Sequence, residues 1–280
     1  MVSRAVVLGG GGHTGFGWQW GLVTGLWEAG IKLVDADLVV GTSAGAMAAA
    51  HLTSGVAPPE LMAVVSVPHE PFHPLMTLGQ DAFVAELVRM LQTGPSAAEI
   101  RAEFGTLAQA RGGASAAVLR SIAGHYAPEE WPEQRLLIPA VDVATAEFRV
   151  FDRSAGVPLV DVVAASCAVP CVWEPVAIAG RRYMDAIVRS PVNADLAAGF
   201  ERVVVIAPLP EIRGVPGGSL AEQIAPAQAE GEVLVITPDT ASRAAIGRNQ
   251  QDLTRRPGAA LAGLAQAESV LADMENHWRG

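Results

Sequence analysis

At residues 40–46 the chain reads VGTSAGA, directly after a short apolar run. Two glycines, Gly41 and Gly45, flank Ser43 at the G-x-S-x-G spacing of a nucleophile elbow, in which a serine leaves a strand and enters a helix through a tight turn. Side chains at those two positions would collide with the backbone, and glycine removes them. The pattern predicts a helix over Ala44–Thr53, whose free N–H groups favour a developing oxyanion. An ordinary strand-to-helix turn capped by a hydroxyl is the alternative.

The residues before the elbow complete a strand-helix-strand unit. The apolar run Ala5–Leu8 is typical of a strand buried on both faces, and it leads into the glycine-rich stretch 9–15. So many adjacent glycines indicate that the backbone approaches another group closely. A helix over Trp18–Ala29 and a strand over Leu38–Val40 follow, so the chain reaches Ser43 at the end of a parallel strand.

Apolar, strand-like runs continue to the C-terminal part of the chain and favour a single α/β domain over residues 1–280. A mostly helical insertion at about 56–132 interrupts them, with an amphipathic helix over 81–92 and another over 115–124. Further expected elements are strands over 136–143, 148–151, 176–178, 203–206 and 233–236, a short helix over 159–166, and a helix over 259–276.

Composition excludes several classes of protein. The 280 residues carry a net charge of −10, and Lys32 is the only lysine, so a nucleic-acid partner is not expected. No apolar run approaches the roughly 20 residues that span a bilayer, and the first residues lack the pattern of a signal peptide. We therefore expect a cytoplasmic protein. Cys167 and Cys171 lack the two further ligands that a zinc site needs, so no metal is expected.

A serine nucleophile needs a base, and the order of the residues favours a carboxylate. In the order Ser, acid, His of the α/β hydrolases, the histidine comes last, but His277 in the final turn is the only late histidine. An aspartate held at a strand end can act on the serine directly. Asp185 fits this role, since it follows the strand-like run 176–178 and a turn at Gly180.

Four motifs in order resemble the patatin-like phospholipase family of serine acyl hydrolases. They are the glycine loop Gly9–Gly15, the elbow Gly41–Gly45, the A-S-x-A-x-P stretch at Ala165–Pro170, and Asp185-Ala186 in place of the family's D-G-[GA]. The resemblance covers about residues 5–208. Two positions differ from the family pattern: Thr14 stands where the family usually carries a basic residue, and Ala186 where it carries glycine.

The resemblance implies a fold and a mechanism. The fold would be a three-layer α/β/α sandwich with a mainly parallel central sheet and a helical cap insertion. Ser43 would be the nucleophile and Asp185 the base of a dyad, and the N–H groups of Gly10, Gly11 and Gly12 would form the oxyanion hole. The substrate would be a lipid or another acyl ester, cleaved through an acyl-enzyme without a metal or cofactor. The sequence does not indicate the head group, the acyl length or the oligomeric state.

Two other functions remain open. Gly10, Gly12 and Gly15 also fit the dinucleotide-binding pattern G-x-G-x-x-G, with Asp35 about twenty residues on, although that aspartate precedes the second strand instead of ending it. A catalytically weak lipid-binding or regulatory module of the same family is the second alternative. Apolar residues of the cap, namely Phe72, Leu75, Met76 and Leu78, offer a transient contact with a membrane surface.

Overall fold

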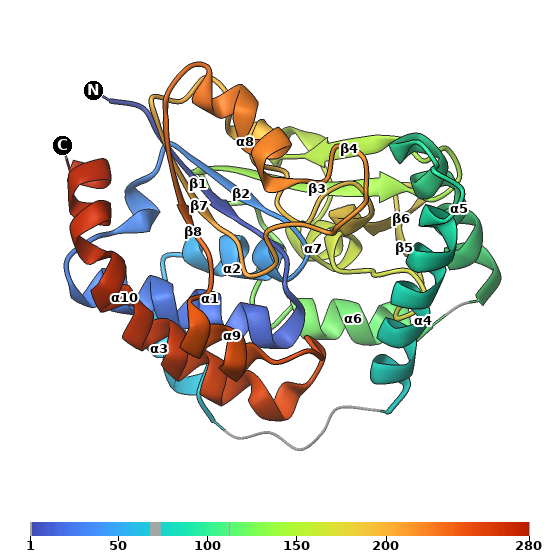
Figure 1. The fold of residues 1–280 in the computed structure, drawn as a ribbon, viewed down its shortest axis with the longest axis horizontal. Coiled ribbons are helices and arrows are strands. Elements are labelled where there is room, and N and C mark those ends of the chain that lie inside the picture. Colours follow the sequence, from blue (N-terminus) through green and yellow to red (C-terminus); the bar gives the residue numbers. More distant parts are fainter. Residues whose placement is uncertain (1, 68–73, 112, 280) are drawn as a thin grey trace.

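A mixed sheet forms the centre of the molecule (Figure 1). The structure, a computed structural model, describes residues 2–67, 74–111 and 113–279, with backbone alone for 74–78. The strand order is β5-β6-β3-β2-β1-β7-β8, and β4 pairs with β3 outside this path. The strands are β1 (Arg4–Leu8), β2 (Leu38–Gly41), β3 (Arg135–Asp142), β4 (Phe148–Phe151), β5 (Val176–Ile178), β6 (Arg181–Asp185), β7 (Arg202–Ile206) and β8 (Glu232–Ile236).

The strands β3, β2, β1, β7 and β8 run parallel to one another, whereas β4 and β6 pair with β3 in the antiparallel direction and β5 pairs with β6 in the same way. Leu8 pairs with Gly41, and Leu8 also pairs with Ile206 on the other side. Because the strands are parallel and in this register, the glycine loop after β1 and the elbow after β2 lie at the same edge of the sheet.

Helices cover both faces of the sheet. They are α1 (Gly12–Glu28), α2 (Ala44–Leu52), α3 (Pro58–Val65), α4 (Pro74–Leu91), α5 (Ala97–Arg111), α6 (Ala116–Ala123), α7 (Leu159–Ser166), α8 (Leu220–Gln228), α9 (Thr240–Ile246) and α10 (Arg256–Arg279). The described residues also form short 3-10 helices, namely η1 (Leu33–Asp35), η2 (Arg153–Ala155), η3 (Ala186–Val188), η4 (Ala194–Ala197) and η5 (Leu253–Arg255). This architecture confirms the expected α/β fold with a mainly parallel central sheet.

The alternation of side chains along the strands divides the core into two layers. In β1, Val6 and Leu8 belong to the larger hydrophobic cluster, which also includes residues of α1, α2, α7 and α10. Ala5 and Val7 point to the other face, where α8 and η4 cover the sheet. Figure 1 shows α8 on one side of the sheet and α1, α3, α9 and α10 on the other. The expected sandwich is therefore confirmed, with unequal helical layers.

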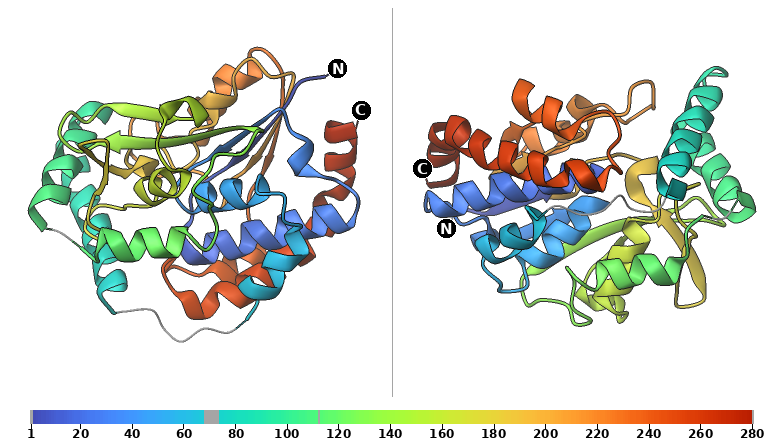
Figure 2. Two further views of the ribbon diagram at one scale, coloured as in Figure 1. Left: turned by 180° about the vertical axis from the view of Figure 1, so that it is seen from behind. Right: turned by 90° about the horizontal axis from the view of Figure 1, so that it is seen from below.

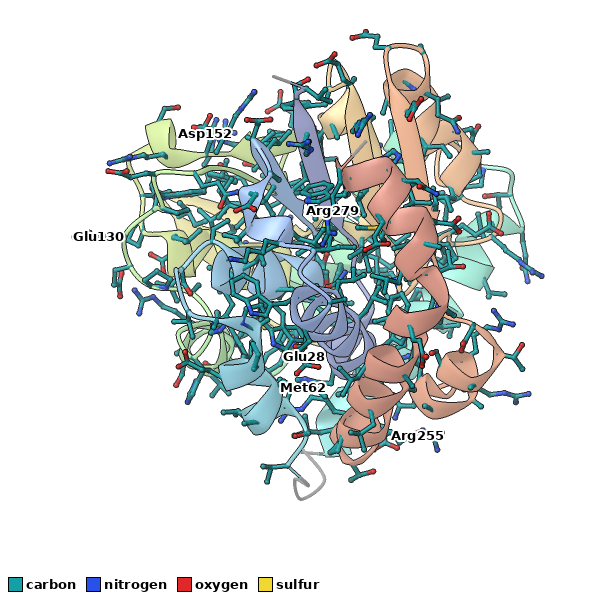
Figure 3. The ribbon with its side chains drawn as sticks, turned by 90° about the vertical axis from the view of Figure 1, so that its left-hand side faces the viewer. Glu28, Met62, Glu130, Asp152, Arg255 and Arg279 are labelled. Atoms are coloured by element: carbon teal, nitrogen blue, oxygen red, sulfur yellow. The ribbon has the colours of Figure 1, made fainter. Side chains whose placement is uncertain are left out.

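The helices α1 and α10 pack closely because small residues lie between them. A Cβ on Gly21 would lie 1.9 Å from the backbone oxygen of Ala260, and a Cβ on Gly263 would lie 2.0 Å from that of Trp18. Side chains at these positions would force the two helices apart. Figure 3 shows α10 running beside α1, with Arg279 near the end of α10 and Glu28 at the end of α1.

The connection between α2 and β3 contains α3, α4, α5 and α6 in its described residues. Helices α4 and α5 stand at the end of the molecule away from both chain termini (Figures 1 and 2). They pack through stacked rings of Phe83 and Phe104, whose centroids lie 4.7 Å apart. Phe72 and the side chains of 75, 76 and 78, where we expected a membrane contact, lie outside the described residues.

Two helices begin earlier than expected, and one of them is α4, which begins at Pro74, seven residues before the expected start at Asp81. Helix α1 begins at Gly12, six residues before the expected start at Trp18. Glycine has a low helix propensity, but tertiary packing overrides it here. A Cβ on Gly15 would lie 2.9 Å from Pro208, and a Cβ on Gly17 would lie 2.6 Å from the backbone oxygen of Arg256. None of the helices in the described part of the chain has the length and hydropathy needed to cross a membrane.

Candidate active site

Ser43 lies in the turn between β2 and α2. Its backbone has φ 55° and ψ −127°, a conformation that a non-glycine residue adopts only when the surrounding structure holds it there. The N–H of Thr42, just before it, donates to the backbone oxygen of Leu8 over 3.0 Å and extends the pairing of β1 with β2 into the turn. Ser43 is 5% exposed, so a substrate must enter a pocket to reach it.

The flanking glycines have the steric role that the motif predicts. A Cβ on Gly45 would lie 2.0 Å from the backbone oxygen of Leu8, and a Cβ on Gly41 would lie 2.5 Å from that of Gly45. Real Cβ atoms do not approach backbone oxygens this closely. A larger residue at Gly45 would therefore separate α2 from the end of β1, and one at Gly41 would separate α2 from β2.

Asp185 lies at the end of β6 and points at the serine. Its Oδ2 accepts a hydrogen bond from Ser43 Oγ over 2.6 Å, and its Oδ1 accepts one from the N–H of Ile187 over 2.8 Å. The pairing of β6 with β3, in which Asp185 lies opposite Ala140, brings this aspartate to the elbow from 142 residues along the chain. The two side chains that the sequence singled out are thus in direct contact.

The environment of Asp185 changes its acidity. The residue is fully buried, and burial raises the pKa of its carboxyl group from 3.8 to about 7, although the hydrogen bonds from Ser43 and Ile187 favour the ionised form. A carboxylate with such a pKa is a far better proton acceptor near neutral pH than an ordinary aspartate. Ala186, which stands at a family glycine position, is the first residue of η3 and does not have a positive φ.

The glycine loop runs past the elbow. A Cβ on Gly10 would lie 3.0 Å from the Cβ of Ser43, so the two backbones approach closely. The N–H of Gly10 donates to the backbone oxygen of Pro191 over 2.7 Å. Among the described residues, no hydrogen bond uses the N–H groups of Gly11 and Gly12, which lie at the start of α1. These two groups are therefore available to an anion.

The two residues after the loop glycines have different surroundings. His13 lines the pocket beside Ser43. Thr14, which replaces the basic residue of the family pattern, is fully buried, and its N–H donates to the backbone oxygen of Gln250 over 3.2 Å. The side chain of Thr14 does not line the pocket.

Helix α7 ends against the elbow and holds both backbone polar groups of Ser43. The N–H of Ser43 donates to Ser166 Oγ over 3.0 Å, and Cys167 Sγ donates to the backbone oxygen of Ser43 over 3.0 Å. Burial raises the pKa of the Cys167 thiol well above its usual value, so the thiol keeps the proton that it donates. The sequence places Ser166 in a family-like motif, but only the position of α7 shows these contacts.

Two cavities meet at Ser43 and Gly12. The first is bounded by apolar side chains of α1, α2, α6 and the loop after α7, among them Phe16, Met47, Leu119, Ile122, Val169 and Trp173. None of the described residues that line it is an aspartate, glutamate, lysine or arginine. The second is a wider groove along α4 and two C-terminal loops. A molecule bound at Ser43 can therefore extend in two directions.

The position of Asp35 argues against dinucleotide binding. Asp35 ends η1 and precedes β2, whereas the glycine loop follows β1. Because β1 and β2 are parallel, Asp35 lies at the opposite edge of the sheet from the glycine loop. It cannot reach a ribose bound at that loop.

Comparisons with known proteins agree with the motifs. A family model described as patatin-like phospholipase matches residues 6–198. A search of curated proteins finds no match. The chain belongs to the patatin-like phospholipase family.

Solved structures also resemble the chain. VipD from Legionella pneumophila has 13% identity and a TM-score of 0.46, covering 98% of this chain and 67% of its own. The type III effector protein ExoU has 18% identity and a TM-score of 0.36, covering 98% and 60%. ExoU from Pseudomonas aeruginosa in complex with SpcU has 17% identity and a TM-score of 0.40, covering 100% and 53%. The chain thus spans between about half and two thirds of the length of these proteins.

Proposed function

We propose that the protein is a serine hydrolase that cleaves carboxylic esters of lipids through a dyad of Ser43 and Asp185. The observation that carries this proposal is the 2.6 Å hydrogen bond from Ser43 Oγ to a buried carboxyl group of raised pKa, made at a strained elbow. Strained backbone and perturbed pKa values cluster at functional sites. Membership of a family described as phospholipases supports the lipid substrate.

The reaction follows from the positions of these groups. Asp185 accepts the proton of Ser43 as the serine oxygen attacks the ester carbonyl carbon. The negative charge on the carbonyl oxygen is stabilised by the free N–H groups of Gly11 and Gly12, whereas that of Gly10 is already engaged by Pro191. The C–O bond then breaks, the alcohol leaves with the proton from Asp185, and water hydrolyses the acyl-enzyme.

The first cavity suits the acyl chain. Its lining is apolar, it opens beside Ser43, and α6 from the helical insertion forms one side of it. A charged group would lose its hydration there without gaining a partner. Val84 and Val88 on α4, which are 49% and 54% exposed, lie along the neighbouring groove and support a transient contact with a lipid surface.

Labelling with a fluorophosphonate probe tests the nucleophile. We expect the wild-type protein to be labelled and to hydrolyse p-nitrophenyl butyrate, and Ser43→Ala to lose both. Ser154→Ala is the matched control, because Ser154 is exposed and, among the described residues, its N–H and hydroxyl groups donate to Asp152 alone. Labelling that persists in Ser43→Ala contradicts the assignment. A folded wild-type protein that binds lipid but turns over no ester indicates the catalytically weak lipid-binding module instead.

A further inference from the structure

A buried turn over residues 190–193 contacts both loops of the candidate active site. On one side, the backbone oxygen of Pro191 accepts the N–H of Gly10 in the glycine loop over 2.7 Å. On the other side, Asn193 Nδ2 donates to Thr42 Oγ1 over 3.1 Å, and Thr42 directly precedes the serine of the elbow. The turn thus connects the glycine loop with the elbow.

Hydrogen bonds within the turn fix its shape. Ser190 Oγ accepts the N–H groups of Val192 and Asn193, each over 3.1 Å, and Asn193 Nδ2 also donates to the backbone oxygen of Ser190 over 2.8 Å. Asn193 has φ 52°, in the left-handed region that asparagine adopts more readily than most residues. Because Asn193 is fully buried, bulk water does not replace these bonds. Its side chain therefore has a fixed position against the elbow.

Arg189 determines which way the amide group of Asn193 faces. Its Nη1 donates to Asn193 Oδ1 over 2.6 Å, and its Nη1 and Nη2 donate to the two carboxylate oxygens of Asp195 over 3.0 and 2.6 Å. A guanidinium group can only donate, so it keeps the amide oxygen on its own side and directs the amide nitrogen towards Thr42. The Thr42 hydroxyl accepts from that nitrogen and donates its own proton to the backbone oxygen of Val192 over 3.3 Å.

Resting on the proposed function, we propose that Asn193 is a positioning residue that holds the elbow through Thr42. It keeps Ser43 at hydrogen-bond distance from Asp185, although the backbone of Ser43 is strained at φ 55°. Asn193 and Thr42 are not among the described residues that line the two cavities at Ser43, so they act on the geometry of the reacting groups and not on the substrate. A displacement of about 1 Å in such groups is enough to slow a reaction strongly.

Removal of the Asn193 side chain and of the Thr42 hydroxyl, singly and together, tests this role. Asn193→Gly is suitable because glycine adopts a positive φ without strain, and Thr42→Val removes the hydroxyl with little change of shape. With p-nitrophenyl butyrate we expect each variant to lower kcat about tenfold and to leave KM unchanged. Because both act through one hydrogen bond, the double variant should also be about tenfold slower, and not about a hundredfold. Thr42→Ser keeps the hydroxyl and should retain most of the turnover.

The pH profile adds a readout that a loss of stability alone would not change. Burial raises the pKa of Asp185 to about 7, and the hydrogen bond from Ser43 lowers it in part. A displaced Ser43 loses this bond, so the midpoint of the kcat/KM profile should move above pH 7 in Asn193→Gly and in Thr42→Val. Burial raises the pKa of the neighbouring Cys167 thiol well above its usual value, so this group stays protonated over the same range.

Asn276→Gly is the matched control, because Asn276 is exposed on α10. It should leave kcat and the pH midpoint unchanged. A folded Asn193→Gly protein with the kcat of the wild type, or effects that multiply in the double variant, overturn the inference. Ester hydrolysis that Ser43→Ala removes would then still support the proposed function.

The two Thr42 variants decide the question if Asn193→Gly does not fold. Equal kcat values in Thr42→Val and Thr42→Ser then overturn the inference, whereas a lower kcat in Thr42→Val alone supports it. Absence of ester hydrolysis by the wild-type protein overturns the proposed function instead, and with it the role of Asn193.

Discussion

The carboxyl group of Asp185 titrates near neutral pH because it is buried, and this controls the proposed chemistry. Asp185 must be ionised to accept the serine proton, and burial raises its pKa from 3.8 to about 7. We expect kcat/KM for p-nitrophenyl butyrate to rise with pH, to reach half its maximum near pH 7 and to be constant above about pH 8. A profile with its midpoint near pH 4 contradicts the role of this group. Asp185→Asn should abolish the turnover at every pH.

The raised pKa of Asp185 also makes the stability of the folded protein depend on pH: stability falls as pH rises, whereas activity rises. The folded protein retains the proton of Asp185 up to about pH 7, whereas the unfolded chain loses it near pH 3.8. The free energy of unfolding therefore falls as pH rises through this window, by up to about 4 kcal/mol for this group. Asp185→Asn removes the buried charge, so we expect it to be more stable than wild type at pH 8 and close to wild type at pH 4. Urea unfolding at both pH values measures the difference.

At the scale of single residues, the sequence predicted the groups whose roles depend on local geometry. Gly41 and Gly45 are identifiable because a tight turn excludes side chains at a fixed spacing from Ser43. The contacts of Ser166 and Cys167 with the Ser43 backbone could not be predicted in the same way. They depend on the placement of α7, which is more than 100 residues from the elbow in the chain.

At the scale of elements, the junction between β1 and α2 requires a glycine. A Cβ on Gly45 would meet the backbone oxygens of Leu8 and Gly9 at 2.0 and 2.6 Å, and backbone cannot move aside as a flexible side chain does. We expect Gly45→Ala to lower the free energy of unfolding by about 3 kcal/mol or more and to displace Ser43. Denaturant unfolding and ester turnover would both detect this change.

Gly258→Ala is the control for that substitution. Gly258 lies in the first turn of α10, and a Cβ there would have no heavy atom within 4 Å. Alanine should therefore stabilise the helix by up to about 1 kcal/mol. If both substitutions change stability equally, the close approach of α2 to the end of β1 is not what requires glycine at position 45.

Most strands were predictable to within a few residues because buried strands are short, continuous apolar runs, but β6, which begins with two exposed arginines, was not among the expected strands. The bounds of the helices were harder to predict from the sequence. The early start of α1 at Gly12 depends on contacts with Pro208 and Arg256, which no local propensity contains. Helices α8 and α9 did not stand out in the sequence, since α8 includes Pro226 and α9 has only seven residues.

At the scale of the whole molecule, the C-terminal region is tied to the N-terminal half through Gln266 of α10. Its Oε1 accepts hydrogen bonds from Trp18 Nε1 over 2.9 Å and from Ser242 Oγ over 2.8 Å, and its Nε2 donates to the backbone oxygen of Thr237. Gln266 is 6% exposed and its partners Trp18 and Ser242 are fully buried, so bulk water cannot replace these hydrogen bonds. One side chain thus joins α1, α9 and α10.

We propose that residues 1–280 fold as one domain and expect Gln266→Leu to show it. Leucine leaves the buried Trp18 N–H and the Thr237 oxygen without partners, which should lower the free energy of unfolding by about 2 to 4 kcal/mol. Gln228→Leu, on the exposed side of α8, should change it by less than about 0.5 kcal/mol. In one domain, tryptophan fluorescence and ester turnover are lost at the same urea concentration, and both midpoints shift together in Gln266→Leu. Retention of turnover after the fluorescence transition would mean that the regions around the tryptophans unfold separately from the Ser43 site, and would contradict a single domain.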